Sequence, residues 1–172
     1  NDREKITTTI TYTATSKIKL QNKAGFNCKV TSHKFDKTSG EGIIIFKNRL
    51  STIGEATFLN ITTLLSITLP DSVTEIGSRA FAGCSSLQSI TIPNSITAIG
   101  DDAFDGCSSI KDVHITDIDA WCRVIFSTWK SNPLCSNANL YINQELASNI
   151  VIPNHTTEIN EHTFCNCKSL QS

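Results

Sequence analysis

A block of 23 residues recurs along this chain, and it restricts the fold more than any other feature. Residues 67–89 (ITLPDSVTEIGSRAFAGCSSLQS) and 90–112 (ITIPNSITAIGDDAFDGCSSIKD) are identical at 13 of 23 positions. Residues 150–172 match the first block at 11 of 23 positions, and residues 44–66 form a weaker copy. Repetition with a period of about 20–29 residues is typical of solenoids, in which each coil buries its apolar side against its neighbours.

Six positions of the block stay apolar from copy to copy, and the first two are spaced two residues apart. This spacing predicts a short strand with alternate side chains pointing inward, ended by the proline that follows it. The predicted inward columns are Ile44, Ile67, Ile90 and Ile150; Leu69, Ile92 and Ile152; Ile53, Ile76, Ile99 and Ile159; Phe58, Phe81, Phe104 and Phe164; Ile61, Cys84, Cys107 and Cys167; and Leu64, Leu87, Ile110 and Leu170.

The register between coils predicts parallel strands, each returning through a crossover. Because the crossover is short, we expect a 3-10 or short helical turn around residues 78–83 rather than a full helix. Gly54, Gly77 and Gly100 recur just before this turn, which predicts a positive φ at that position. Asn160 replaces glycine in the last copy and is expected to adopt the same backbone conformation.

Two segments lack the simple repeat. Residues 1–43 are rich in Thr and Ile with alternating polarity, which predicts strands that cap the first coil. Residues 113–149 are predicted to form one enlarged coil, with a helix capped by Asp117 or Asp119 and a strand and turn over 139–146. The predicted coils are therefore 44–66, 67–89, 90–112, 113–149 and 150–172, and we expect the native protein to continue beyond Ser172.

The enlarged coil contains both tryptophans. Trp121, Trp129 and Tyr141 are either the small core of this insert or a platform on which a sugar ring stacks, and the first interpretation is favoured. Inserts in repeat proteins often lie at a binding edge.

Charge and composition exclude several functions. The net charge is −1, although residues 1–50 alone carry +6, so the chain as a whole does not favour nucleic acid as a partner. The sequence contains no apolar run of 18 residues, so it predicts no membrane span. The chain has no methionine, even at position 1, which predicts a trimmed start.

The side chains that alternate with the inward strand residues are the candidate ligand surface. In a curved solenoid this row forms the concave face. The candidate residues are Ser66, Thr68, Ser89, Thr91, Asp112, His114, Asn149 and Val151.

No pattern in the sequence points to catalysis or to a cofactor. His162, Cys165 and Cys167 superficially resemble a zinc-ligand spacing, but Cys167 falls in a buried column and a second ligand pair is missing. The aspartates at 101–119 are expected to lie on different sides of a coil, which disfavours calcium. The chain is therefore predicted to be non-enzymatic, with no metal and no cofactor.

The phrase shared by the repeats resembles the BspA-like leucine-rich repeats, also described as the Treponema pallidum type. The resemblance covers residues 44–116 and 150–172, and the segments before and between them are similar to the corresponding parts of gut Bacteroides surface proteins. It implies a leucine-rich-repeat solenoid that is secreted or displayed on the cell surface. It also implies adhesion to a host extracellular protein or glycan, or to another bacterial surface molecule.

Three hypotheses about function stay open at this point. The first is a non-enzymatic adhesion module that binds through the concave face. The second is a structural spacer that projects another domain from the cell surface and has no ligand of its own. The third, which is disfavoured, is an enzyme with its site in the insert at 113–149.

Overall fold

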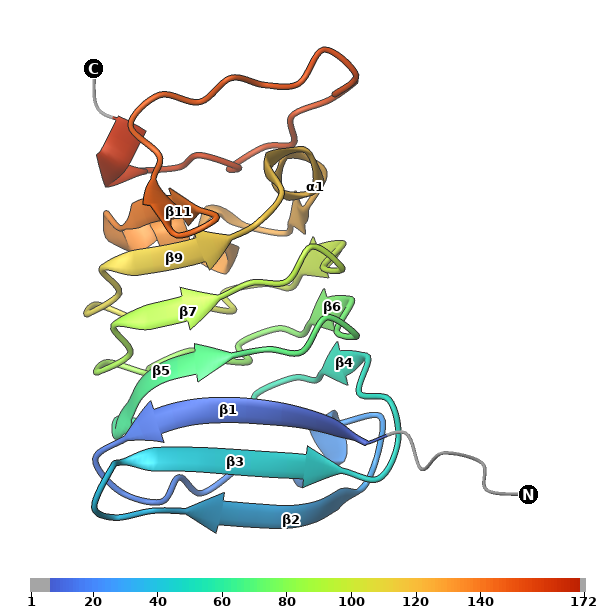
Figure 1. Cartoon of the computed structure of the whole chain (residues 1–172), viewed down its shortest axis with the longest axis vertical. Helices are drawn as coiled ribbons and strands as arrows, with labels where there is room; N and C mark the ends of the chain where they lie inside the picture. Colours follow the sequence, from blue (N-terminus) through green and yellow to red (C-terminus); the bar gives the residue numbers. More distant parts are fainter. Residues whose placement is uncertain (1–6, 171–172) are drawn as a thin grey trace.

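The computed structural model describes residues 7–170, which form a stack of coils on an antiparallel cap (Figure 1). An eight-stranded sheet runs along one side of the stack in the order β12-β11-β9-β7-β5-β1-β3-β2. Its strands are β1 (Thr8–Ala14), β2 (Val30–Phe35), β3 (Glu41–Phe46), β5 (Leu64–Thr68), β7 (Ser89–Thr91), β9 (Asp112–Ile115), β11 (Asn139–Ile142) and β12 (Glu145–Leu146).

A second, narrower sheet also extends along the stack. Its strands pair in parallel, in the order β10-β8-β6-β4. Its two-residue strands are β4 (Thr52–Ile53), β6 (Glu75–Ile76), β8 (Ala98–Ile99) and β10 (Ile125–Phe126). In the regular coils, both sheets pair parallel strands one 23-residue repeat apart, as in Ile67 with Ile90 and Ile53 with Ile76. The predicted parallel register is confirmed for the coils that begin at residues 67 and 90.

The turn at residues 78–83 is a series of tight turns and not the expected 3-10 or short helix. Alternate N–H groups bond within the turn, as Ala80 to Gly77 at 3.2 Å, and the others bond to the next coil, as Phe81 to Ala103 at 2.9 Å. A helix would direct all of these donors into one coil. The observed turn satisfies the backbone while it also connects neighbouring coils.

The expected positive φ at the recurring glycines is wrong. Among the described residues, the left-handed backbone recurs two and six positions later, at Ala56, Arg79, Asp102 and His162 and at Asn60, Gly83, Gly106 and Asn166. Gly77 is required for a different reason, since a Cβ there would lie 2.7 Å from the Glu55 backbone nitrogen. Asn160 likewise has no positive φ.

The apolar columns form the core as predicted in the first coils. Phe58, Phe81 and Phe104 stack with ring centroids 4.9 and 5.2 Å apart and planes within 5° of parallel. Phe26 of the cap closes this column edge-on against Phe58 at 6.1 Å. The buried thiol of Cys107 donates to the Phe81 carbonyl at 3.0 Å, so it fills a core position and satisfies a turn carbonyl.

The cap is the antiparallel unit formed by β1, β2 and β3, with the 3-10 helix η1 (Lys23–Gly25). Ile44 is buried, but its strand β3 pairs antiparallel with β1, opposite Ile10. The expectation that Ile44 pairs in parallel as the first rung is therefore wrong, because β1 lies between β3 and β5. Strand β3 also crosses the expected boundary between residues 43 and 44.

In the enlarged coil, the next strand of the eight-stranded sheet pairs in parallel after 27 residues and not after the usual 23. Helix α1 (Ile118–Cys122) is capped by Asp117, one of the two predicted caps, whose carboxylate accepts from the Asp119 and Ala120 N–H groups. The 3-10 helices η2 (Trp129–Ser131) and η3 (Pro133–Ser136) follow β10, and β11 then pairs in parallel with β9, opposing Leu140 to Val113. The predicted strand and turn over 139–146 are confirmed as β11 and β12.

The last repeat departs from the prediction. Residues 150–160 form no strand, and Val151 and Ile159 are 86% and 51% exposed. Phe126 takes the column position expected of Ile159, since it pairs with Ile99. The predicted inward position is confirmed for Cys167, which is buried directly before η4 (Lys168–Leu170).

A carboxylate holds the irregular arc of the last repeat on α1. Asp119 accepts a hydrogen bond from the Thr156 hydroxyl at 2.7 Å and pairs with Arg123. The Thr156 hydrogen bond, followed by that from Arg123, holds the pKa of Asp119 below its ordinary value. The carboxylate therefore contributes stability that is present above the ordinary pKa and is lost as the pH falls through the lower, folded-state pKa.

We expect Asp119→Asn to loosen this arc at neutral pH and to make its opening less dependent on acidification. The readout is the hydrogen-exchange protection of the Asn160 amide, which donates to the Cys122 carbonyl at 3.0 Å. Protection of the Gly100 amide, in a regular coil, serves as the control. Equal acid sensitivity of Asn160 in the wild type and the variant would contradict the assignment.

Candidate functional site: the outer face of the eight-stranded sheet

The outer face of the eight-stranded sheet carries two rows of side chains that cross successive strands. They point away from the core because the strand residues between them, such as Ile67 and Ile90, are buried. We call them the threonine row and the serine row. The threonine row is Lys34, Ile43, Thr11, Thr68, Thr91, His114 and Tyr141. The serine row is Glu41, Thr13, Ser66, Ser89, Asp112 and Asn139.

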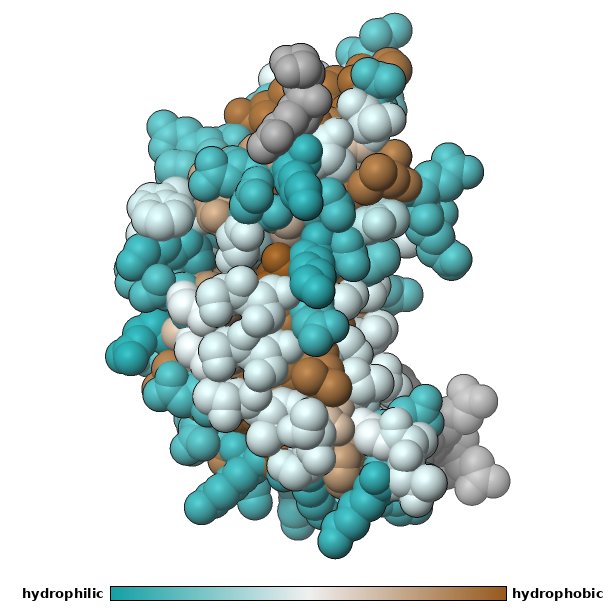
Figure 2. Space-filling view, turned by 90° about the vertical axis from the view of Figure 1, so that its left-hand side faces the viewer, coloured by the Kyte–Doolittle hydropathy of each residue, from teal (hydrophilic) through white to brown (hydrophobic). Residues whose placement is uncertain are grey.

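This face is the hollow side of the molecule. Figure 2 shows the stack from the side, with the outer face of the sheet along the right-hand outline, which curves inward between the two ends. The middle of the face is small and hydroxylated, and the Thr13 and Ser66 hydroxyls hydrogen-bond across strands at 2.7 Å. A surface of short side chains leaves room for a ligand to approach the backbone.

Six of the eight predicted site residues lie in these rows: Ser66, Thr68, Ser89, Thr91, Asp112 and His114. Asn149 and Val151 do not, because residues 149–151 form no strand and lie outside the sheet. Asn139 and Tyr141 instead occupy the two positions at which Asn149 and Val151 were expected. The reason is that β11 is the strand that pairs with β9. The alternation of Leu140 with its polar neighbours was the signal that could have located this rung.

Hollows lie along this face, one of about 370 Å³ beside Thr11, Thr68 and Asp71 and two others that border the rows. The one at the cap end has a volume of about 520 Å³ and is lined by hydroxyls and by the carboxylates of Asp36 and Glu41. The Asp36 carboxylate also stabilises the turn between β2 and β3, because it accepts a hydrogen bond from the Thr38 N–H at 2.7 Å. The other hollow has a volume of about 290 Å³ and lies beside His114, where the imidazole stacks on Tyr141 at 4.9 Å.

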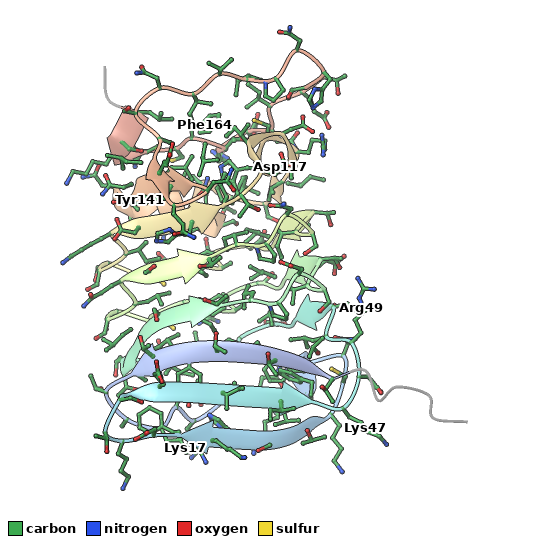
Figure 3. All side chains as sticks on the ribbon, in the orientation of Figure 1. Lys17, Lys47, Arg49, Asp117, Tyr141 and Phe164 are labelled. Carbon is green, nitrogen blue, oxygen red and sulfur yellow. The ribbon has the colours of Figure 1, made fainter. Side chains whose placement is uncertain are left out.

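The three residues considered as a stacking platform lie in three separate places. Trp121 is buried and donates its indole N–H to the Thr163 carbonyl at 3.0 Å, which confirms the core interpretation for this residue. Trp129 is half exposed, with the Lys130 ammonium 5.6 Å from its ring. Tyr141 lies at the upper end of the sheet in Figure 3. The three therefore form no common platform.

The cap end of the molecule is electropositive. Residues 7–50 carry eight Lys and Arg against two Asp and Glu, and Figure 3 places Lys17 and Lys47 at this end. Burial, together with Lys17 and Lys23, lowers the pKa of His33, whose ring hydrogen-bonds the Tyr12 hydroxyl at 2.7 Å. Such a field acts on charged partners within about 8 Å at physiological salt, so it does not dominate the middle of the sheet.

Within residues 7–170, no cluster of three or more His, Cys, Asp or Glu side chains has the geometry to hold a metal ion. No helix in the described part of the chain is long and apolar enough to cross a membrane. The outer face of the sheet carries polar side chains in a regular order from strand to strand.

Comparison with known families gives a clear match. The model of the BspA type leucine rich repeat region matches residues 28–128 and 137–172, in six copies. The chain is 27% identical to a leucine-rich repeat protein from Bacteroides ovatus, over 74% of this chain and 29% of that one, with a TM-score of 0.46. It is 25% identical to the T. pallidum leucine rich repeat protein, over 67% of this chain and 48% of that one, with a TM-score of 0.37. A search of curated proteins found no match.

Proposed function

The chain belongs to the BspA-type leucine-rich-repeat family, and from this premise we propose that it is a non-enzymatic interaction module of the cell surface or the secreted fraction. Its partner is an extracellular protein or glycan of a host, or a surface molecule of another bacterium. The concave outer face of the eight-stranded sheet binds this partner. The observation that carries the proposal is the continuity of the threonine row across seven strands.

The chemistry of the row supports binding rather than catalysis. Thr68 and Thr91 are paired one above the other, with strands about 4.8 Å apart, so their hydroxyls form a regular ladder of donors and acceptors. These side chains have few rotatable bonds, and little entropy is lost when a ligand orders them. A ligand that lies along the ladder gains many weak hydrogen bonds from a surface that is already fixed by the core.

We expect Thr68→Arg combined with Thr91→Arg to abolish binding without unfolding the chain. Two long cationic side chains would project over the middle of the face and obstruct its small-residue surface. Binding is measured by a solid-phase assay against collagen, laminin, fibronectin and neutral and anionic glycans, and folding by circular dichroism.

The matched control is Ser85→Arg combined with Ser108→Arg. These two serines are also one repeat apart and exposed, but they lie in the turns and not on the sheet. The control adds the same charge at the same spacing, so it should bind as the wild type does. Binding that survives in the Thr68 and Thr91 double variant would exclude the concave face. A complete absence of ligands would favour a spacer function instead.

A further inference from the structure

The hairpin formed by β11 and β12 is held in a strained turn. Its two loop residues, Asn143 and Gln144, have φ angles of 52° and 70°. A two-residue hairpin of this kind requires positive φ at both positions, for which glycine, asparagine and aspartate are preferred. Gln144 has no such preference, and a strained conformation of this kind persists only where the surrounding structure enforces it. Such positions cluster at ligand sites.

The hairpin is firmly anchored beside the sheet. The Asn143 N–H donates to the Ile115 carbonyl at 3.0 Å, and the Ala147 N–H donates to the Leu140 carbonyl at 2.9 Å. These bonds place the tip of the hairpin at the end of the threonine row. Both tip side chains are exposed, and neither side-chain amide hydrogen-bonds another residue in the part of the chain described. Two carboxamides are thus available to a ligand at a fixed place.

The tip closes one side of the 290 Å³ hollow next to His114. The hollow is lined by Thr91, His114, Ile115, Thr116, Asn143 and Gln144. The His114 ring is backed by Tyr141, with 22° between the two planes, so its orientation is fixed by stacking. The Thr116 hydroxyl is oriented by its hydrogen bond to Asn94 Oδ1 at 2.7 Å.

We propose that this hollow, between His114 and the Asn143–Gln144 tip, is a binding subsite for a neutral saccharide ring. The inference rests on the proposed function and narrows its partner to a glycan. A sugar ring presents polarised C–H groups on its faces and hydroxyls at its edge. An aromatic ring face attracts the C–H groups, and carboxamides and hydroxyls both donate and accept hydrogen bonds.

The lining also selects against charged ligands. It contains no Lys, Arg, Asp or Glu, so a sulfated or carboxylated ring would lose hydration without gaining a counter-charge. Its volume lies near the lower limit of ordinary ligand pockets, about 300 Å³, which fits one ring and not a longer segment. A longer glycan would continue along the threonine row, towards Thr91 and Thr68.

The exposed Trp129 is the alternative aromatic site, and its surroundings differ. Lys130 lies over the ring and forms an ion pair with Asp105 at 3.1 Å, so charged groups border it. Trp129 therefore serves as the control for nonspecific stacking on an exposed aromatic ring.

The test is binding of the full chain to an array of neutral gluco-, galacto- and manno-oligosaccharides, with sialylated and sulfated glycans and the matrix proteins printed alongside. We expect saturable binding to one class of neutral glycan. His114→Ala and Gln144→Gly should each weaken it about tenfold, the scale of one stacking contact or hydrogen bond. Trp129→Ala, which lies outside the sheet, should bind within about twofold of the wild type.

Gln144→Gly keeps the test independent of folding. Glycine adopts the positive φ without strain, so this variant removes the carboxamide while the hairpin is retained or stabilised. Equal weakening of binding by Trp129→Ala would overturn the subsite, as would binding to charged glycans only. Binding to a matrix protein only, lost in the Thr68 and Thr91 double variant, would overturn the subsite and retain the proposed function. No binding to any printed ligand would overturn both.

Discussion

Phe81→Ala is expected to destabilise the chain by about 3–5 kcal/mol, as truncations of fully buried aromatic side chains do. Phe81 has no exposed surface and stacks between Phe58 and Phe104, with centroids at 4.9 and 5.2 Å. Removal of its ring leaves a cavity bounded by two other rings, and neither can move inward without breaking the backbone bonds that join the coils. Because each coil contacts only its neighbours, one truncation weakens both interfaces of the coil that carries it.

Urea denaturation followed by far-ultraviolet circular dichroism measures this loss. Phe164→Ala is the matched control, because it removes the same atoms from the last repeat, where the side chain is only partly buried. Phe81→Leu keeps most of the apolar volume and should cost less than Phe81→Ala. A loss below about 1 kcal/mol for Phe81→Ala would contradict the stacked column.

The regular part of this fold can be predicted from the sequence because the repeat fixes the contacts as well as the elements. Two similar blocks that adopt the same backbone conformation bring equivalent positions together, so Phe81 must lie on Phe104. No knowledge of the distant contacts is needed to obtain the parallel register. This is why the inward columns of residues 67–112 were predicted position by position.

The last repeat could not be predicted in this way, although it shares 11 positions with the first block. A strand forms only where a neighbouring edge accepts its hydrogen bonds. Strand β12 pairs with β11, on the side away from β9, and so takes the edge that the strand at residues 150–152 would need. Sequence identity shows that a copy could adopt the fold, but it does not show which edge is already occupied.

The wrong positions in the predicted candidate site have the same cause, because β11 and not residues 149–151 pairs with β9. The prediction extended the row from His114 to Asn149 and Val151 by counting repeats. The structure extends it to Asn139 and Tyr141, which an insert places 27 residues after Asp112 and His114. The stacked pair of His114 and Tyr141 therefore follows from an irregularity, and the periodicity that gives the rest of the face cannot reveal it.

Gly77→Ala is expected to cost about 3 kcal/mol, near the upper end of the range for overpacking. Gly77 lies against Gly54 of the preceding coil, and a Cβ would come within 2.7 Å of the Glu55 nitrogen and 2.8 Å of the Gly54 carbonyl carbon. Both obstacles are backbone atoms, so relief requires the coils to separate, which strains the 2.7 Å bond from the Gly77 N–H to the Ile53 carbonyl.

Gly106→Asn is the control that separates crowding from backbone conformation. Gly106 has a φ of +74°, yet a Cβ there would lie 3.4 Å from the nearest atom, and the equivalent Asn60 and Asn166 adopt this conformation naturally. We expect Gly106→Asn to cost about 1 kcal/mol or less in the same urea experiment, because asparagine tolerates the left-handed region. The reverse order of the two losses would mean that these glycines are needed for their backbone angles and not for the close approach of coils. The spacing between coils therefore depends on two sets of residues. No side chain fits at Gly54, Gly77 and Gly100, and no ring can be removed from the stacked Phe58, Phe81 and Phe104 without leaving a cavity.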